Sequence, residues 1–261
     1  MADLQRLFSP RSIAILGVSE DPRTIRGRLL HVLLQRGYAG RLHLVSRTLK
    51  AVHGRATVPT LDDVPETVDL AILAAPAAAV PELVEQCGQN GIRAVLVIAS
   101  GFAEERGEAG RERERRLQEI AARYDMAVFG PNTEGYVNNV DRVAATFCPT
   151  LENPAISLDA TVKVDKRIAV VSQSGGFAFT FLNISQQRQI SYSFMVSSGN
   201  ESCLETADYV RYLIERGDTD LFLLYLEGVR DAAKLRRALE AAADVGKPII
   251  AAKTGRSQAG S

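Results

Sequence analysis

Short apolar runs alternate with amphipathic stretches along the first half of the chain. The apolar runs have the length of buried strands and end in small residues, as in residues 12–18 (SIAILGV) and 94–99 (AVLVIA). Further strands are predicted at residues 41–45, 68–74 and 127–129, and helices at residues 27–36, 80–87 and 104–124. Strands that alternate with helices indicate βαβ units, which predicts an open parallel sheet with helices on both faces.

The alternation stops at residues 149–166, which contain Pro149 and Pro154 and show little periodicity. It then restarts, with strands predicted at residues 167–171, 191–196, 221–226 and 248–252 and helices at residues 175–187, 204–216 and 232–243. We therefore expect an α/β protein of two successive open, doubly wound parallel-sheet domains, at residues 1–148 and 167–261, joined by a linker at residues 149–166.

The composition narrows the classes of function. The chain has 261 residues, and its 31 Lys and Arg balance its 31 Asp and Glu, which argues against binding to nucleic acid or to an anionic membrane through bulk charge. Its three cysteines, Cys87, Cys148 and Cys203, are far apart and have no histidine cluster near them, so neither a disulfide framework nor a metal site is expected. No signal peptide or membrane span is apparent, and the cytoplasm is the expected compartment.

Ligands of open parallel sheets bind beyond the carboxyl ends of the strands, and several residues there suit an anion. Gly17 and Ser19 follow the first strand, and Arg26 lies near the start of the next helix. Ser46 and Arg47 follow the second strand, where an arginine suits the extra ribose phosphate of CoA or NADP. A tight turn at Gly17 and a solvated Arg47 are the alternatives. The G-x-G-x-x-G pattern is absent, which disfavours NAD.

The second half contains a stronger signal at residues 171–176 (VSQSGG), where a strand ends in hydroxyls and glycines and a helix begins at once. A helix N-terminus with small residues suits a phosphate group, although a simple serine cap is the alternative. Glu227 ends the strand at residues 221–226, where a carboxylate could orient a histidine, bind a cation or cap a helix. The three histidines, His31, His43 and His53, all lie in the first half, and no catalytic triad is predicted.

Taken in order, these segments resemble the acyl-CoA synthetases that form ADP, relatives of the succinyl-CoA synthetase alpha subunit. The resemblance spans the whole chain, and its motifs are individually weak but specific as an ordered set. They are the turn at residues 17–19, VDLAILAAPA at 68–77, ASGFAE at 99–104, GPNTEG at 130–135, VSQSGG at 171–176, VSSGNE at 196–201, YLEGVRD at 225–231 and KPIIAAKTGRS at 247–257.

The resemblance implies a Rossmann-like CoA-binding domain followed by a flavodoxin-like, succinyl-CoA-ligase-like domain. It implies a CoA site formed by Gly17, Ser19, Arg26, Ser46, Arg47, Ala75, Pro76, Ser100 and Gly101. A phosphoryl site would be formed by Ser172, Gln173, Ser174, Gly175 and Gly176, with Glu227 orienting a phosphohistidine and with Asn132 and Asn200 as further site residues.

The same resemblance implies a reaction and its partners. In this family ATP phosphorylates a histidine, the phosphoryl group passes to a carboxylic acid, and CoA displaces it to give a thioester. The implied partners are CoA, the acid, and an ATP-grasp domain or subunit that binds ATP or ADP with Mg²⁺. Assembly into a homo-oligomer stays open from the sequence. The family's histidine belongs to a segment shortly after the GRS motif, whereas this chain ends at Ser261, so we expect an incomplete second domain and no activity of the chain alone.

Two substitutions depart from the family pattern. Ser46 and Arg47 stand where the family usually has Asn-Pro, which affects the adenosine end of the CoA site, and Thr133 and Glu134 stand where it has Cys-Leu, which is expected to alter the acyl pocket. Two other functions stay open from the sequence. One is a non-catalytic CoA-sensing module, as in synthetase–acetyltransferase fusions, and the other is an NADP-dependent oxidoreductase.

Overall fold

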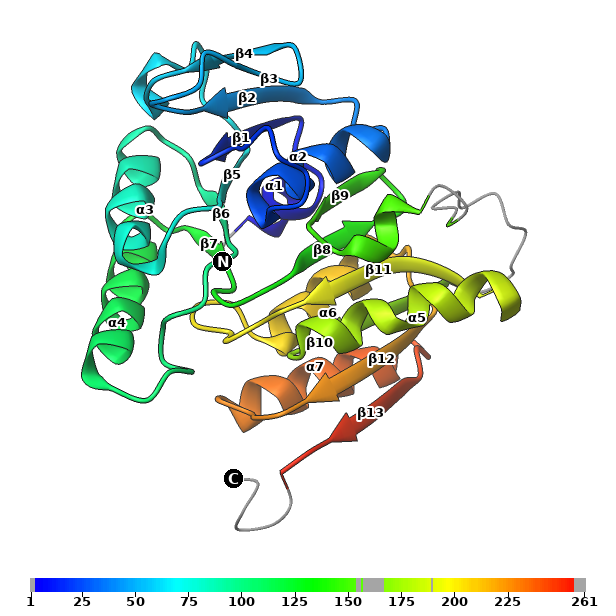
Figure 1. Cartoon of the computed structure of the whole chain (residues 1–261). Helices are drawn as coiled ribbons and strands as arrows, with labels where there is room; N and C mark the ends of the chain where they lie inside the picture. Colours follow the sequence, from blue (N-terminus) through cyan, green and yellow to red (C-terminus); the bar gives the residue numbers. More distant parts are fainter. Residues whose placement is uncertain (1–2, 154–155, 157–166, 189, 256–261) are drawn as a thin grey trace.

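The computed structural model describes residues 3–153, 156, 167–188 and 190–255. Two open sheets lie one beside the other, each with helices on both faces (Figure 1). The strand order is β3-β4-β2-β1-β5-β6-β7 in the first sheet and β13-β12-β10-β11-β8-β9 in the second. The predicted α/β class with two open sheets is therefore confirmed. No helix in the described ranges has the length and apolar character needed to cross a bilayer.

With helices in three of the connections, the chain returns to the same edge of the first sheet, and the five strands predicted for this sheet run parallel. They are β1 (Ser12–Leu16), β2 (Arg41–Val45), β5 (Leu70–Leu73), β6 (Ala94–Val97) and β7 (Ala127–Phe129). Two short strands that the sequence pattern missed, β3 (Ala51–Val52) and β4 (Arg55–Val58), extend the sheet beyond β2.

Alternate residues of β1 explain why both faces of the first sheet are covered. Ile13 and Ile15 pack against α1 (Leu4–Phe8) and α2 (Ile25–Gln35), whereas Ala14 and Leu16 belong to the cluster formed with α3 (Val80–Gln89) and α4 (Glu108–Arg123). Successive strand residues point to opposite faces, so a strand covered on both sides has a continuous apolar run rather than an alternating one.

The second sheet is mixed, with a parallel part and an antiparallel hairpin. Its parallel strands are β10 (Arg167–Ser172), β11 (Ser191–Ser197), β12 (Leu221–Leu226) and β13 (Ile249–Lys253). Helix α5 (Gly175–Arg188) covers one face, and α6 (Thr206–Arg216) and α7 (Ala232–Asp244) cover the other (Figure 1). Apolar residues again alternate along β10 between these two layers.

The hairpin of β8 (Gly135–Asn138) and β9 (Val143–Thr146) pairs with β11 in antiparallel register. The sequence pattern did not predict these strands, each of which has four residues and ends in a polar one. Residues 135–146 were assigned to the first domain, yet they extend the second sheet. The chain thus enters the second sheet before residue 148, and the domain boundary proposed there stays a prediction.

Most of the predicted linker at residues 149–166 lies outside the described residues. Its described beginning forms the 3-10 helix η3 (Pro149–Glu152), which packs against α2. Helix α4 begins at Glu108 rather than at residue 104, because residues 101–104 form a separate turn. In that turn the carboxylate of Glu104 accepts hydrogen bonds from the backbone N–H groups of Gly101 and Phe102, at 2.6 and 3.2 Å.

One apolar cluster joins the two sheets. Phe8 of α1 lies edge-on to Phe129 of the first sheet and to Tyr136 and Phe194 of the second, with ring centroids 4.9 to 6.1 Å apart. All four side chains are fully buried. Aromatic pairs in this geometry are stabilised beyond their buried area, so the two sheets are packed as one body.

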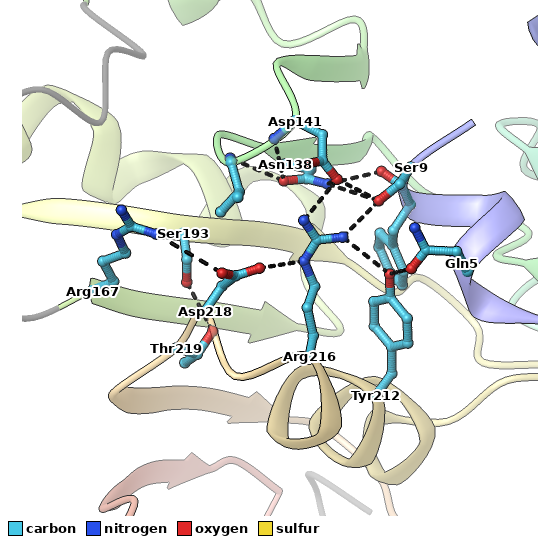
Figure 2. Close-up of polar contacts among 12 residues, drawn as sticks. Gln5, Ser9, Asn138, Asp141, Arg167, Ser193, Tyr212, Arg216, Asp218 and Thr219 are labelled. Carbon is cyan, nitrogen blue, oxygen red and sulfur yellow. Dashed lines mark hydrogen bonds and ion pairs between the residues drawn. The ribbon is translucent and has the colours of Figure 1, made fainter. Parts of the chain in front are cut away.

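A polar junction, formed by Ser9, Asn138, Asp141, Arg216 and Asp218, lies beside this cluster (Figure 2). Arg216, at the end of α6, has a side chain only 14% exposed and pairs with Asp141 at 2.7 Å and with Asp218 at 2.5 Å. Its guanidinium also donates to the hydroxyl of Ser9 at 2.7 Å. The junction therefore ties the N-terminal segment, the β8–β9 hairpin and α6 together.

Candidate functional site: a cleft between the carboxyl ends of the two sheets

Adjacent strands of the first sheet end level with one another. Leu16 of β1 is paired with Val45 of β2 and with Leu73 of β5, and Leu73 is paired with Val97 of β6. The residues that follow these strands must therefore lie in a row along one edge. The row contains most of the residues predicted for CoA: Gly17, Ser19, Ser46, Arg47, Ala75, Pro76, Ser100 and Gly101.

Gly17 allows the turn after β1 to pass close to the turn after β5. Its φ is +91°, and a Cβ there would lie 2.6 Å from the backbone oxygen of Ala74. A larger residue would displace one of the two turns. The nearby hydroxyl of Ser19 accepts a hydrogen bond from the backbone N–H of Asp21 at 3.2 Å, which shapes the segment leading into α2.

The basic residues of this edge differ in their availability. Arg26 and Arg47 are exposed, and within the described ranges neither forms an ion pair. Arg28 instead pairs with Glu152 at 2.8 Å, so it is engaged within the protein. The hydroxyl of Ser46 accepts a hydrogen bond from the backbone N–H of Leu49 at 3.1 Å, which supports the turn that carries Arg47.

The predicted phosphoryl loop follows β10 and leads directly into α5. Ser172 is fully buried, and its hydroxyl forms hydrogen bonds with the backbone of Ser174, donating to the oxygen at 2.8 Å and accepting from the N–H at 3.1 Å. Ser172 therefore shapes the loop from inside. Gly176 faces open space, since a Cβ there would meet no atom within 4 Å. A phosphate group can thus approach the helix N-terminus at Gly176, which fits the predicted ligand.

Gln173 fixes the position of Glu227. Its side-chain oxygen accepts hydrogen bonds from the backbone N–H groups of Glu227 and Gly228, at 2.6 and 2.9 Å, and its side-chain nitrogen donates to the oxygen of Gly228 at 3.0 Å. This clamp joins the loop after β10 to the turn after β12. Gln173 therefore acts as a structural link in the site, in addition to its predicted place at the phosphate.

A cleft of about 600 Å³ opens where the carboxyl ends of the two sheets meet. It brings together predicted residues of both sheets: Pro76, Ser100, Asn132, Gln173, Ser174, Gly175, Gly176 and Glu227. The other predicted residues do not line it: Gly17, Ser19, Arg26, Ser46, Arg47, Ala75, Gly101, Ser172 and Asn200. The CoA row thus runs away from the cleft along the first sheet, as a long ligand would require.

Glu114 and Arg230 are site-supporting residues that the sequence analysis missed. Glu114, on α4, has a side chain 6% exposed and accepts hydrogen bonds from Arg230 at 2.7 Å and from the side chain of Asn200 at 3.3 Å. Asn200 also accepts from the side chain of Asn132 at 3.1 Å and donates to Glu104. These contacts hold the turn after β6 against the loop after β12. Glu114 lies in a run of Glu and Arg that is typical of a solvated helix, which concealed it.

Two family models match the chain in succession. One is described as a CoA binding domain and matches residues 11–138, and the other is described as a succinyl-CoA ligase like flavodoxin domain and matches residues 165–261. The acetate–CoA ligase [ADP-forming] I of Archaeoglobus fulgidus is 34% identical over 258 residues, which are 98% of this chain and 35% of the relative. The chain belongs to the family of ADP-forming acyl-CoA synthetases.

Other members of the family give the same picture. The alpha subunit of acetate–CoA ligase [ADP-forming] I from Pyrococcus furiosus is also 34% identical, over 98% of this chain and 54% of the subunit. The apo form of the dinucleotide-forming acetyl-coenzyme A synthetase 1 of Ca. Korarchaeum cryptofilum has a TM-score of 0.86 at 33% identity, over 99% of this chain and 54% of that one. The chain thus spans about a third to a half of the length of these synthetases.

Proposed function

We propose that the chain is the CoA-binding and phosphoryl-handling part of an ADP-forming acid–CoA ligase. The observation that carries this proposal is the cleft, where Pro76 and Ser100 of the CoA row face Ser174 and Gly176 of the phosphoryl loop. A ligase of this kind must bring the thiol end of CoA to an acyl phosphate. Holding both ligands at the carboxyl ends of two adjoining sheets does this without a large movement.

The proposed reaction divides one difficult step into three. The γ-phosphoryl group of ATP moves to a histidine and ADP leaves; a carboxylate oxygen of the acid then takes the phosphoryl group to give an acyl phosphate. The CoA sulfur attacks the acyl carbon, phosphate leaves with the bonding electron pair, and the thiol proton passes to solvent. The sequence has three histidines, His31, His43 and His53, and none of them lines the cleft, so the phosphorylated histidine would come from outside these 261 residues.

The partners follow from that reaction. An ATP-grasp domain or subunit would supply ATP and Mg²⁺, and the exposed turn at Glu227 is where it would deliver the phosphoryl group. We place the protein in the cytoplasm, where CoA and ATP are available, and regard a homo-oligomer as compatible with the proposal. A purely CoA-sensing module would need the CoA row alone, whereas the clamp from Gln173 to Glu227 organises the phosphoryl loop.

Calorimetric titration with CoA tests the first half of the proposal. We expect CoA to bind and NADP not to bind, with weaker CoA binding at higher salt because exposed arginines contact its phosphates.

Replacing Arg26 and Arg47 together with alanine should weaken CoA binding by about tenfold or more, since each charge-assisted hydrogen bond contributes about 1.5–3 kcal/mol. Replacing Arg236, an exposed arginine on α7, is the matched control and should leave CoA binding unchanged. NADP binding without CoA binding would contradict the proposal.

A further inference from the structure

Glu134 lines the cleft, at the turn that leads into β8. Its backbone N–H donates to the hydroxyl of Ser197 at 3.2 Å. The preceding residue, Thr133, donates its hydroxyl to the backbone oxygen of Ser197. The same hydroxyl accepts a hydrogen bond from the backbone N–H of the following residue, Gly135, at 2.7 Å. Thr133 is buried, so these contacts fix the backbone of Glu134 at the cleft.

The side chain of Glu134 lies against the first residue of α5. A Cβ built on Gly175 would be 3.0 Å from Glu134 Oε1, so the carboxylate occupies the space beside the phosphoryl loop. It is half-buried, and burial raises its pKa. Within the described part of the chain no cation lies within ion-pair distance of it.

Apart from the N-terminus of α5, the remaining lining of the cleft offers this carboxylate no positive charge. Ser100, Asn132, Gln173 and Ser174 are polar but neutral. Ile25, Ala77, Ile98 and Phe147 are apolar, and the other ionisable side chain that lines the cleft is the acid Glu227. A partly desolvated carboxylate without a partner is unfavourable, and a cationic hydrogen-bond donor relieves that cost. An acid with a plain alkyl chain would bury the carboxylate of Glu134 further and would provide no hydrogen-bond donor or positive charge to it.

We propose that Glu134 selects carboxylic acids that carry an ammonium group on their carbon chain, so that the ligase acts on amino acids in preference to alkyl acids of the same size. The inference rests on the proposed function and specifies its substrate class. The acid's own carboxylate meets the phosphoryl group at residues 174–176, and its ammonium group donates to Glu134. The nitrogen takes no part in the bonds that form and break.

The test compares isosteric acids in the complete ligase, with the ATP-grasp part present. We expect kcat/KM for 3-aminopropanoate to exceed that for butanoate by about tenfold or more, and likewise for 4-aminobutanoate over pentanoate, as one charge-assisted hydrogen bond allows. The Glu134→Leu variant, which keeps the side chain's approximate size, should reverse the preference, and Glu134→Gln should reduce it. Glu215→Gln, an exposed site on α6, is the matched control.

The outcomes separate this inference from the proposed function. Turnover of the alkyl acids with equal or better kcat/KM than their amino counterparts would overturn the role of Glu134 and leave the ligase function intact. A preference that Glu134→Leu leaves unchanged, with only a lower melting temperature, would reduce Glu134 to a cap of α5 and also overturn it. No thioester from any acid, together with no CoA binding, would overturn both.

Discussion

Replacing Glu227 with glutamine is expected to lower the kcat of acyl-CoA formation by about a hundredfold or more. The carboxylate lines the cleft together with Ser174 and Gly176, and it would orient the proposed phosphohistidine there. An amide has the same size but no negative charge, so it can neither stabilise an imidazolium nor fix the required tautomer. The measurement is steady-state thioester formation by the complete ligase.

The position of the residue should survive this change, which makes the result interpretable. Gln173 holds residue 227 through its backbone N–H, at 2.6 Å, and that contact does not depend on the side chain. CoA affinity should therefore stay within about twofold of the wild-type value. The exposed Glu215→Gln variant should keep full activity. Wild-type kcat in Glu227→Gln would remove this carboxylate from the phosphoryl step.

Replacing Arg216 with methionine should lower the free energy of unfolding by about 3 kcal/mol. The side chain is only 14% exposed and neutralises Asp141 and Asp218, at 2.7 and 2.5 Å. Its removal takes this cation from Asp141 and leaves Asp218 with the more distant Arg167, at 4.0 Å. The guanidinium also lies over the ring of Phe194, with Cζ 5.4 Å from the ring centroid, and methionine removes this contact while it keeps much of the apolar stem. Urea unfolding at pH 7 measures the change.

A control on the same helix and a pH series sharpen this prediction. Arg211 pairs with Glu215 at 3.5 Å on the exposed face of α6, and its replacement by methionine should lower the free energy of unfolding by less than about 0.5 kcal/mol.

Burial opposes the charge of Asp141, but hydrogen bonds from Ser9 and Asn138 and the charge of Arg216 lower its pKa. Its ionised form thus stabilises the fold above the unfolded pKa, near 4, and that contribution disappears as pH falls through the lowered folded pKa. The difference between Arg216→Met and wild type should shrink in the same range, and equal losses from Arg211 and Arg216 would contradict the junction.

The sequence predicted the strands that form recognisable apolar or alternating runs and missed β3, β4, β8 and β9, which are two to four residues long. Runs such as residues 94–97 are apolar throughout because helices cover both sides, and such runs are conspicuous. The hairpin strands at residues 135–138 and 143–146 are short, and β8 pairs with β11, a strand about sixty residues further along the chain. No local pattern encodes that pairing, so the fold class was predictable and the place where the chain changes sheets was not.

The site shows the same division. Glycines and hydroxyls after parallel strands pointed to the row at the first sheet and to the loop at residues 172–176, because parallel topology alone brings strand ends to one edge. The partners of those residues were not predictable. The clamp by Gln173, the internal use of Ser172 and the ion pair of Glu114 with Arg230 depend on how two sheets pack together. A pattern along one chain does not contain that geometry.

The β8–β9 hairpin has a consequence for folding of the chain during its synthesis on the ribosome. All strands of the first sheet can pair once β7 has emerged from the ribosome. The hairpin, which ends at Thr146, must then wait for its partner strand β11, which begins at Ser191. At about 5–20 residues per second, that delay lasts a few seconds, during which the free edge of β8 can pair with another nascent chain. Translation pauses between these two strands should therefore raise the fraction of chains captured by chaperones.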